Sequence, residues 1–181
     1  MANKYEERLG TERMLPLIFK MALPAVAAQF VNLLYSMVDR IYIGHIPGIG
    51  TDALAGVGVT TSLVILISSL SAIVGGGGAP LAAIALGQGE RSRAGKILGN
   101  GFILLILFTL FTSLIAYTFM EPILLFTGAS ENTLEYAVDY LSIYLLGTIF
   151  VEISTGLNSF INAQGRPAIA MYSVLIGALL N

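Results

Sequence analysis

An acidic residue, Asp39, lies near the end of an apolar segment in which other polar side chains recur at helical spacing. With about 100° between successive helical residues, every polar side chain from residue 21 to residue 39 falls within an arc of about 120°. If the segment crosses a membrane, an acid there is costly to bury and commonly marks an ion or proton pathway. This first stripe therefore predicts a cation site ending at Asp39; its members are Gln29, Asn32, Tyr35, Ser36 and Asp39.

A second polar stripe occupies a similar arc of about 120° in the apolar segment that follows residue 140. A membrane helix with such a stripe should face the interior of a helix bundle or a water-filled cavity. The stripe contains a second acid and consists of Tyr140, Tyr144, Thr148, Glu152, Thr155, Asn158, Ser159 and Asn162. We interpret the two stripes as the lining of one cavity.

A simpler interpretation stays open for part of both stripes. Single Ser and Thr side chains often bond back to their own helix. Asp39 could also lie in water at the membrane surface beside Arg40, although the two residues are about 100° apart on the wheel. The presence of Asp39 and Glu152 together on polar stripes favours a functional role for these two acids over a purely structural or surface role.

A carboxylate in a low-dielectric cavity can bind a proton, or a small hard cation held with other oxygen ligands. Either event changes the charge of the site and can couple cation entry to helix movement. Pro24 lies in the first third of the same segment, where it leaves a carbonyl group unpaired and provides a place for the helix to bend.

The composition is that of an integral membrane protein. Of the 181 residues, 56% are hydrophobic and 11% are charged, whereas soluble domains carry about 25% charged residues. The chain has no cysteine, which excludes disulfides and thiolate sites. Its net charge of −2 and the lack of a basic patch argue against nucleic acid as a partner.

Charged and turn residues divide the chain into five expected helices, at about 14–44, 53–86, 95–120, 131–164 and 167–181. The first four are long enough to cross a bilayer core of about 30 Å. The fifth would reach only about 22 Å, so we expect the chain to stop inside a fifth transmembrane helix.

We interpret the glycine-rich stretch VGGGGAPLAA as close packing or a kink, because it lacks the Lys-Ser/Thr of a phosphate loop. His45 is a lone loop histidine, and we find no catalytic pair, which predicts that the protein is not an enzyme.

The chain resembles the multidrug and toxic compound extrusion (MATE) family of transporters over essentially its whole length. The matching text includes LPAVAAQFVNLLYSMVDRIYIG, GGGGAPLAAIALGQGERSRAG, YLSIYLLGTIFVEISTGLNSFINAQGRP and LIGALLN. The resemblance implies an all-α, polytopic membrane protein of twelve helices in two six-helix lobes. This chain would hold helices one to four of the first lobe and the start of helix five.

The resemblance also implies roles for individual residues. Asp39 matches the aspartate that binds Na⁺ or a proton, Asn181 an asparagine of the same cation site, and Pro24 the proline at which the first helix bends. Asn158 and Tyr140 match cavity-lining positions. The resemblance assigns no role to Glu152, which depends on the helical wheel alone.

The implied function is export of small organic, often cationic, compounds in exchange for Na⁺ or H⁺ by alternating access, without a cofactor. The expected location is the inner or plasma membrane, and the expected partners are the substrate, the bilayer and the remainder of the chain. A lipid-linked oligosaccharide flippase is an alternative, although its cavity would carry several basic residues. An intramembrane enzyme and a non-transporting membrane scaffold are alternatives from other classes.

The distribution of basic residues predicts the orientation. Eight of the nine Lys and Arg residues fall on one side of the expected membrane, and Arg40 falls on the other. The positive-inside rule then places the N-terminus in the cytoplasm. Cysteines introduced at Ser92 and Gly48 should therefore react with an impermeant thiol reagent from opposite sides of the membrane. Reaction of both from one side would contradict the helix count.

Overall fold

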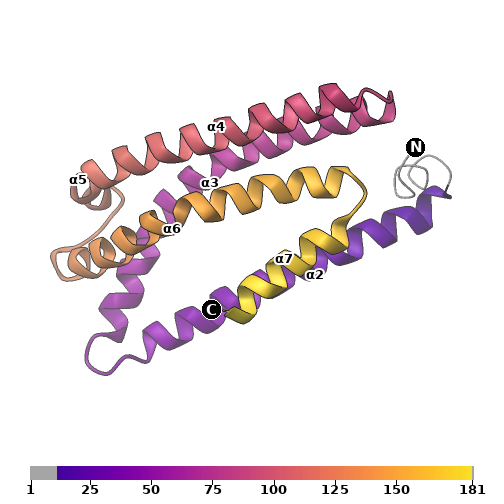
Figure 1. Ribbon diagram of the computed structural model, residues 1–181. Coiled ribbons are helices and arrows are strands. Elements are labelled where there is room, and N and C mark those ends of the chain that lie inside the picture. The colour runs from indigo at the N-terminus through magenta and orange to yellow at the C-terminus, as the bar shows by residue number, and fades with distance from the viewer. Residues whose placement is uncertain (1–11, 181) are drawn as a thin grey trace.

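The computed structural model describes residues 12–180, and every regular element in that range is a helix. In chain order these are α2 (Met14–Gly44), α3 (Gly50–Gly87), α4 (Arg91–Thr118), α5 (Met120–Phe126), α6 (Glu131–Ala163) and α7 (Pro167–Leu180), shown in Figure 1. One expected helix, at 95–120, corresponds to α4, and the chain then turns at Phe119 into the separate helix α5. Helix α2 continues through Pro24.

Four of these helices, α2, α3, α4 and α6, are long and apolar enough to cross a membrane. Helix α7 is a shorter apolar helix. Most large hydrophobic side chains on α2 and α4 are exposed, as expected for surfaces that contact lipid or further protein. The described residues therefore form an all-α, multi-pass membrane protein.

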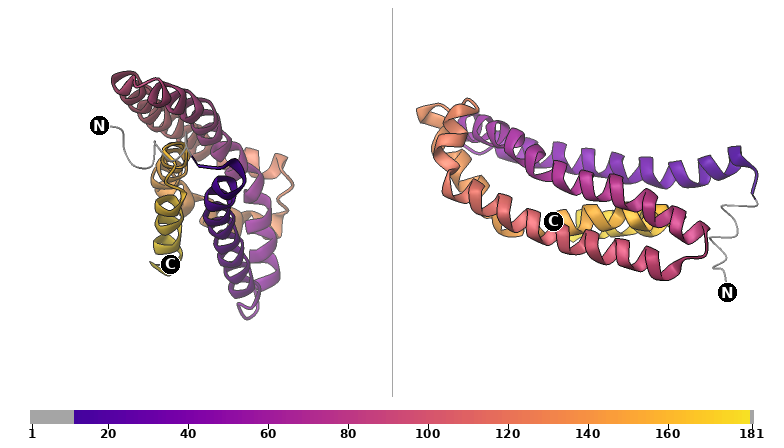
Figure 2. Two further views of the ribbon diagram at one scale, coloured as in Figure 1. Left: turned by 90° about the vertical axis from the view of Figure 1, so that its right-hand side faces the viewer. Right: turned by 90° about the horizontal axis from the view of Figure 1, so that it is seen from above.

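The helices form two groups. Helices α3, α4 and α6 pack on one another, and α7 runs beside α2 (Figures 1 and 2). The larger apolar core lies where α3 and α6 meet α5 and the end of α4, around Ile67, Leu124 and Leu141. A smaller core surrounds Phe160 near the other end of α6. Helix α2 contributes no buried residue to these cores.

Small residues let α3 approach α6 closely. A Cβ atom added to Gly56 would lie 2.9 Å from the carbonyl oxygen of Thr133 and 3.0 Å from the backbone nitrogen of Ala137. A Cβ on Gly75 would lie 2.6 Å from Ser159 Oγ. Because these neighbours include the backbone of α6, larger residues would force the two helices apart.

The glycine-rich stretch on α3 is only partly explained by this packing. Gly75 and Gly78 face α6, and a Cβ on Gly78 would lie 2.7 Å from Phe160 Cζ. A Cβ added to Gly76 or Gly77 would have no neighbour within 4 Å among the described residues. The helix runs unbroken through this stretch and through Pro80.

The close contact between α3 and α6 makes a stability prediction. Gly56→Ala should lower the free energy of unfolding by about 1–3 kcal/mol, because the added methyl group overpacks a site bounded by backbone atoms. Gly58→Ala is the matched control, since a Cβ added to Gly58 on the same helix would meet no described atom within 4 Å. Thermal unfolding of the detergent-purified protein measures both. Equal melting temperatures for the two variants would contradict the packing described.

Candidate functional site

Asp39 lines a cleft of about 670 Å³ between α2, α3 and α6. We call it the Asp39 cleft. Its lining residues are Tyr35, Ser36, Asp39, Arg40, Tyr42 and Ile43 from α2, Val57, Thr60, Thr61 and Val64 from α3, and Tyr140 and Tyr144 from α6. Residues from both predicted stripes therefore lie around one cavity.

The α2 wall of the cleft carries opposite charges on adjacent residues. Asp39 is half-buried, whereas Arg40 is exposed. The helical wheel separates the two by about 100°, yet both line the cleft because its wall covers more than one face of α2. Separation on the helical wheel therefore does not keep Arg40 out of the cleft.

The α3 wall adds hydroxyl groups that the two predicted stripes did not include. The Oγ1 atoms of Thr60 and Thr61 both donate to the carbonyl oxygen of Val57, at 2.8 and 3.2 Å. A hydroxyl group that donates its proton to its own helix retains oxygen lone pairs for a ligand. Thr61 can therefore present an acceptor oxygen to the cleft, whereas Thr60 is almost completely buried.

The α6 wall is aromatic. Tyr140 and Tyr144 stack with their ring centroids 6.2 Å apart and their planes inclined by 18°. Successive turns of α6 hold the two rings in this arrangement, since the residues are four positions apart. The cleft thus combines a carboxylate, hydroxyl oxygens and flat apolar surfaces.

This set of oxygen atoms suits a monovalent cation or a proton better than a multivalent metal ion. Within residues 12–180, no group of three or more His, Cys, Asp or Glu side chains is placed to hold a metal ion. A divalent ion usually takes several carboxylate ligands. The Asp39 cleft offers one carboxylate and otherwise neutral oxygen atoms.

A second cleft, of about 440 Å³, lies between α2, α6 and α7. We call it the Asn158 cleft. The Oδ1 atom of Asn158 accepts a hydrogen bond of 3.1 Å from Ser173 Oγ on α7. Three stripe residues line this cleft rather than the first: Asn32, Thr155 and Asn158. Tyr35 lines both clefts and so lies between them.

The remaining predicted residues lie elsewhere. Gln29 is exposed on α2 and does not line either cleft. Asn162 is partly buried near the end of α6, where its Oδ1 atom has no hydrogen-bond partner among the described residues. Thr148 is completely buried and donates to the carbonyl oxygen of Tyr144 at 2.9 Å. Asn181 lies outside the described residues.

Glu152 is buried between α6 and α3 rather than facing either cleft. It is 1% exposed. Ser68 Oγ donates to Glu152 Oε1 at 2.8 Å, and Ser71 Oγ bonds to Glu152 Oε2 and lies 3.2 Å from the carbonyl oxygen of Glu152. Both carboxyl oxygens are thus satisfied by hydroxyl groups of α3.

The two predicted stripes do not include the polar residues of α3, although the spacing of these residues in the sequence indicates a stripe of their own. Thr60, Thr61, Ser68 and Ser71 fall within an arc of about 100° on a helical wheel. They form a third polar stripe. The two threonines line the Asp39 cleft, and the two serines bind Glu152.

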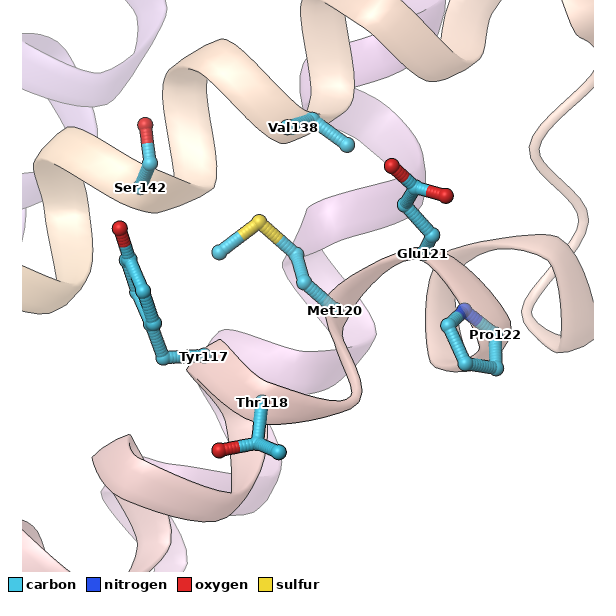
Figure 3. A pocket seen from close by; sticks show the side chains of 7 residues that line it. All are labelled: Tyr117, Thr118, Met120, Glu121, Pro122, Val138 and Ser142. Carbon is cyan, nitrogen blue, oxygen red and sulfur yellow. The ribbon is translucent and has the colours of Figure 1, made fainter.

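A third cavity, of about 330 Å³, lies where α4 and α5 meet α6, away from the stripes. Figure 3 shows the hydroxyl end of Tyr117 directed toward Ser142 of α6, with Met120 between α4 and α6. The Ser142 hydroxyl group already donates to the carbonyl oxygen of Asp139 at 2.9 Å. None of the predicted site residues lines this cavity.

Comparisons with known proteins agree on one family. The family model MatE matches residues 24–181. The chain is 24% identical over 164 residues to the FAD transporter of Shewanella oneidensis, an alignment that covers 91% of this chain and 36% of the relative. It is 23% identical over 160 residues to the multidrug export protein MepA of Staphylococcus haemolyticus, covering 88% of this chain and 35% of the relative.

A further relative is the probable multidrug resistance protein NorM of Pseudomonas putida, 26% identical over 164 residues. That alignment covers 91% of this chain and 35% of the relative. The chain therefore spans about a third of the length of the curated relatives that it matches. No solved structure matches the chain significantly.

The position of Thr61 in the Asp39 cleft makes a prediction about water access. A cysteine at Thr61 should react with a charged, water-soluble thiol reagent at least several-fold faster than a cysteine at Leu66. Leu66 is 67% exposed but lies on a different face of α3, about 140° from Thr61. Reaction rates in membrane vesicles measure the difference. Equal rates would show that the cleft is not filled by water.

Proposed function

The chain belongs to the multidrug and toxic compound extrusion (MATE) family, and we propose that the protein is a secondary antiporter. It exports small organic compounds in exchange for Na⁺ or H⁺ by alternating access. The observation that carries this proposal is the Asp39 cleft, where one half-buried carboxylate faces hydroxyl oxygens of α3 and stacked tyrosines of α6.

A single carboxylate explains how exchange is coupled. A cation bound at Asp39 neutralises the site, and release of the cation restores a negative charge to the cleft. An organic cation binds the charged state more tightly than the neutral one. The two ligands then favour different states of the same site, which is the requirement for a coupled exchange.

The aromatic wall supports small organic compounds as the cargo. The rings of Tyr140 and Tyr144 offer flat surfaces on which planar molecules stack, and aromatic faces also attract cations. The names of the relatives, which refer to FAD and to multidrug export, agree with a cargo of small molecules.

The polar lining of the cleft favours an antiporter over a lipid-linked oligosaccharide flippase. Arg40 is the one basic residue among the described residues that line it, and the other polar groups are hydroxyls and the Asp39 carboxylate. A pyrophosphate group is best held by several basic side chains. The cleft offers it a single guanidinium group and an opposing negative charge.

We place the described helices in the first of two six-helix lobes, inserted in the cell membrane with the N-terminus in the cytoplasm. The relatives are about two and a half times as long as this chain, which leaves room for a second lobe. Asn181 follows α7 directly, and we propose that it supplies a further oxygen ligand to the cation. Pro24 would allow α2 to bend when the cation is bound.

The proposal predicts the effect of neutralising Asp39. In the complete gene product that contains this chain, Asp39→Asn keeps the shape of the side chain but removes its charge. Substrate efflux driven by a Na⁺ or H⁺ gradient in energised vesicles should fall at least tenfold. Substrate should still bind to the purified variant.

Asp139→Asn is the matched control for this variant. Asp139 precedes Tyr140 on α6, is exposed, and does not line the Asp39 cleft. The same chemical change there should leave efflux near the wild-type rate at equal expression. Wild-type efflux by Asp39→Asn would refute the coupling role.

A further inference from the structure

Glu152 lies just beyond the inner end of the Asp39 cleft. Val64 and Tyr144 line the cleft, Ser68 follows Val64 by one turn of α3, and Glu152 follows Tyr144 by two turns of α6. These spacings correspond to about 6 Å and about 12 Å along the respective helices. Tyr144 is also within electrostatic range of Glu152.

Among the described residues, the side chains that bond to Glu152 carry hydroxyl groups rather than positive charges. Its side chain is hydrogen-bonded to Ser68 and Ser71 of α3. On α4, Leu105 packs against α6 one turn away, next to Gly156. Burying an ionised carboxylate without a cationic partner carries a large free-energy cost, which a neutral carboxyl group avoids.

Apart from Tyr144, the titratable groups of the helices that pack on this site lie at a distance along their helices. On α3 the titratable residue is Asp52, in the first turn. Arg91 borders a small cavity together with Phe160 and Gln164, at least two turns of α6, or about 12 Å, from Glu152. The other titratable groups of α4 are Arg93 and Lys96, near its start, and Tyr117, near its end; those of α6 are Glu131, Glu135, Tyr136, Asp139, Tyr140 and Tyr144.

The hydrogen bonds can accommodate either protonation state. With a neutral acid, Oε2–H donates to Ser71 Oγ, and the Ser71 hydroxyl group donates to the carbonyl oxygen of Glu152, 3.2 Å away. With a carboxylate, the Ser71 hydroxyl group rotates and donates to Oε2 instead. Ser68 donates to Oε1 in both states. Rotation of one hydroxyl group therefore lets the site take up or release a proton without leaving a donor unpaired.

We propose that Glu152, held by Ser68 and Ser71, is a second proton-binding site of this protein, separate from the Asp39 cleft. Proton uptake converts the carboxylate and one H⁺ into a neutral carboxyl group, and proton release reverses the step. The site lies on the contact between α3 and α6, whose side chains form two walls of the cleft, so its charge acts on substrate binding. This last step rests on the proposed function, whereas proton binding itself does not.

Infrared difference spectroscopy of the purified complete protein tests proton binding directly. The wild-type protein should show the carbonyl band of a protonated carboxyl group, and the band should shift on exchange into ²H₂O. Glu152→Gln, which keeps a hydrogen-bonding partner for both serines, should lose that band. Glu135→Gln, a change to an exposed glutamate on the same helix, should retain it.

Ser71→Ala provides a second variant in case Glu152→Gln fails to fold. The band should remain but move to higher frequency, because the carboxyl group loses the hydrogen bond to Ser71. Two results would overturn the inference. One is an infrared spectrum whose carboxyl bands are the same in the wild type and Glu152→Gln at every pH. The other is a spectrum whose carboxyl bands are the same in the wild type and Ser71→Ala.

Proton release on substrate binding separates this inference from the proposed function. The wild type should release about one proton more per bound substrate molecule than Glu152→Gln. If the band depends on Glu152 but the protein transports nothing, the proposed function fails and the proton site stands. If transport is normal and the band is absent, only the inference about Glu152 fails.

Discussion

The close contact between α3 and α6 is the constraint on which the rest of the structure depends. A membrane interior leaves polar groups no water to bind, so hydrogen bonds and close packing must be made between helices. Gly56 and Gly75 allow the two backbones to approach. The Glu152 carboxyl group, which is hydrogen-bonded to two serines of α3, lies in the same contact between α3 and α6. This pair of helices is therefore the fixed frame against which α2 and α7 are placed.

The Asp39 cleft follows from the difference between the two helix groups. Helix α2 has no buried residue and packs beside α7, whereas α3 and α6 contribute to both apolar cores. Asp39 thus lies on α2 and faces hydroxyl and aromatic side chains of α3 and α6. A ligand that changes the charge at Asp39 can shift the position of α2 if it binds one position better than the other. Alternating access requires such a difference.

Much of the fold could be predicted from the sequence, because hydrophobic length and charge set the helices of a membrane protein. The helical wheel placed Asp39, Tyr140 and Tyr144 on polar stripes, and these three residues line one cleft. It could not show that Glu152 turns toward α3, since a wheel gives the face of a helix and not the neighbour on that face. The separate helix α5 begins after a turn at Phe119, and Pro122 in its first turn was an overlooked signal, because proline cannot donate a hydrogen bond to the carbonyl group of Thr118 four residues back. The α3 hydroxyl groups were detectable by the same wheel but were hidden in an uncharged, glycine-rich segment.

The central claim is that the coupling cation and the exported compound favour different charge states of the Asp39 cleft, so that each weakens the binding of the other. The most direct measurement is the equilibrium Kd of the purified complete protein for a transported compound, with Na⁺ titrated at constant pH and H⁺ titrated at constant Na⁺. Competition predicts that the Kd rises with one of the two cations, by a factor within the range of roughly 5–150 that is usual for coupled sites. A Kd that is unchanged across both titrations would contradict the account.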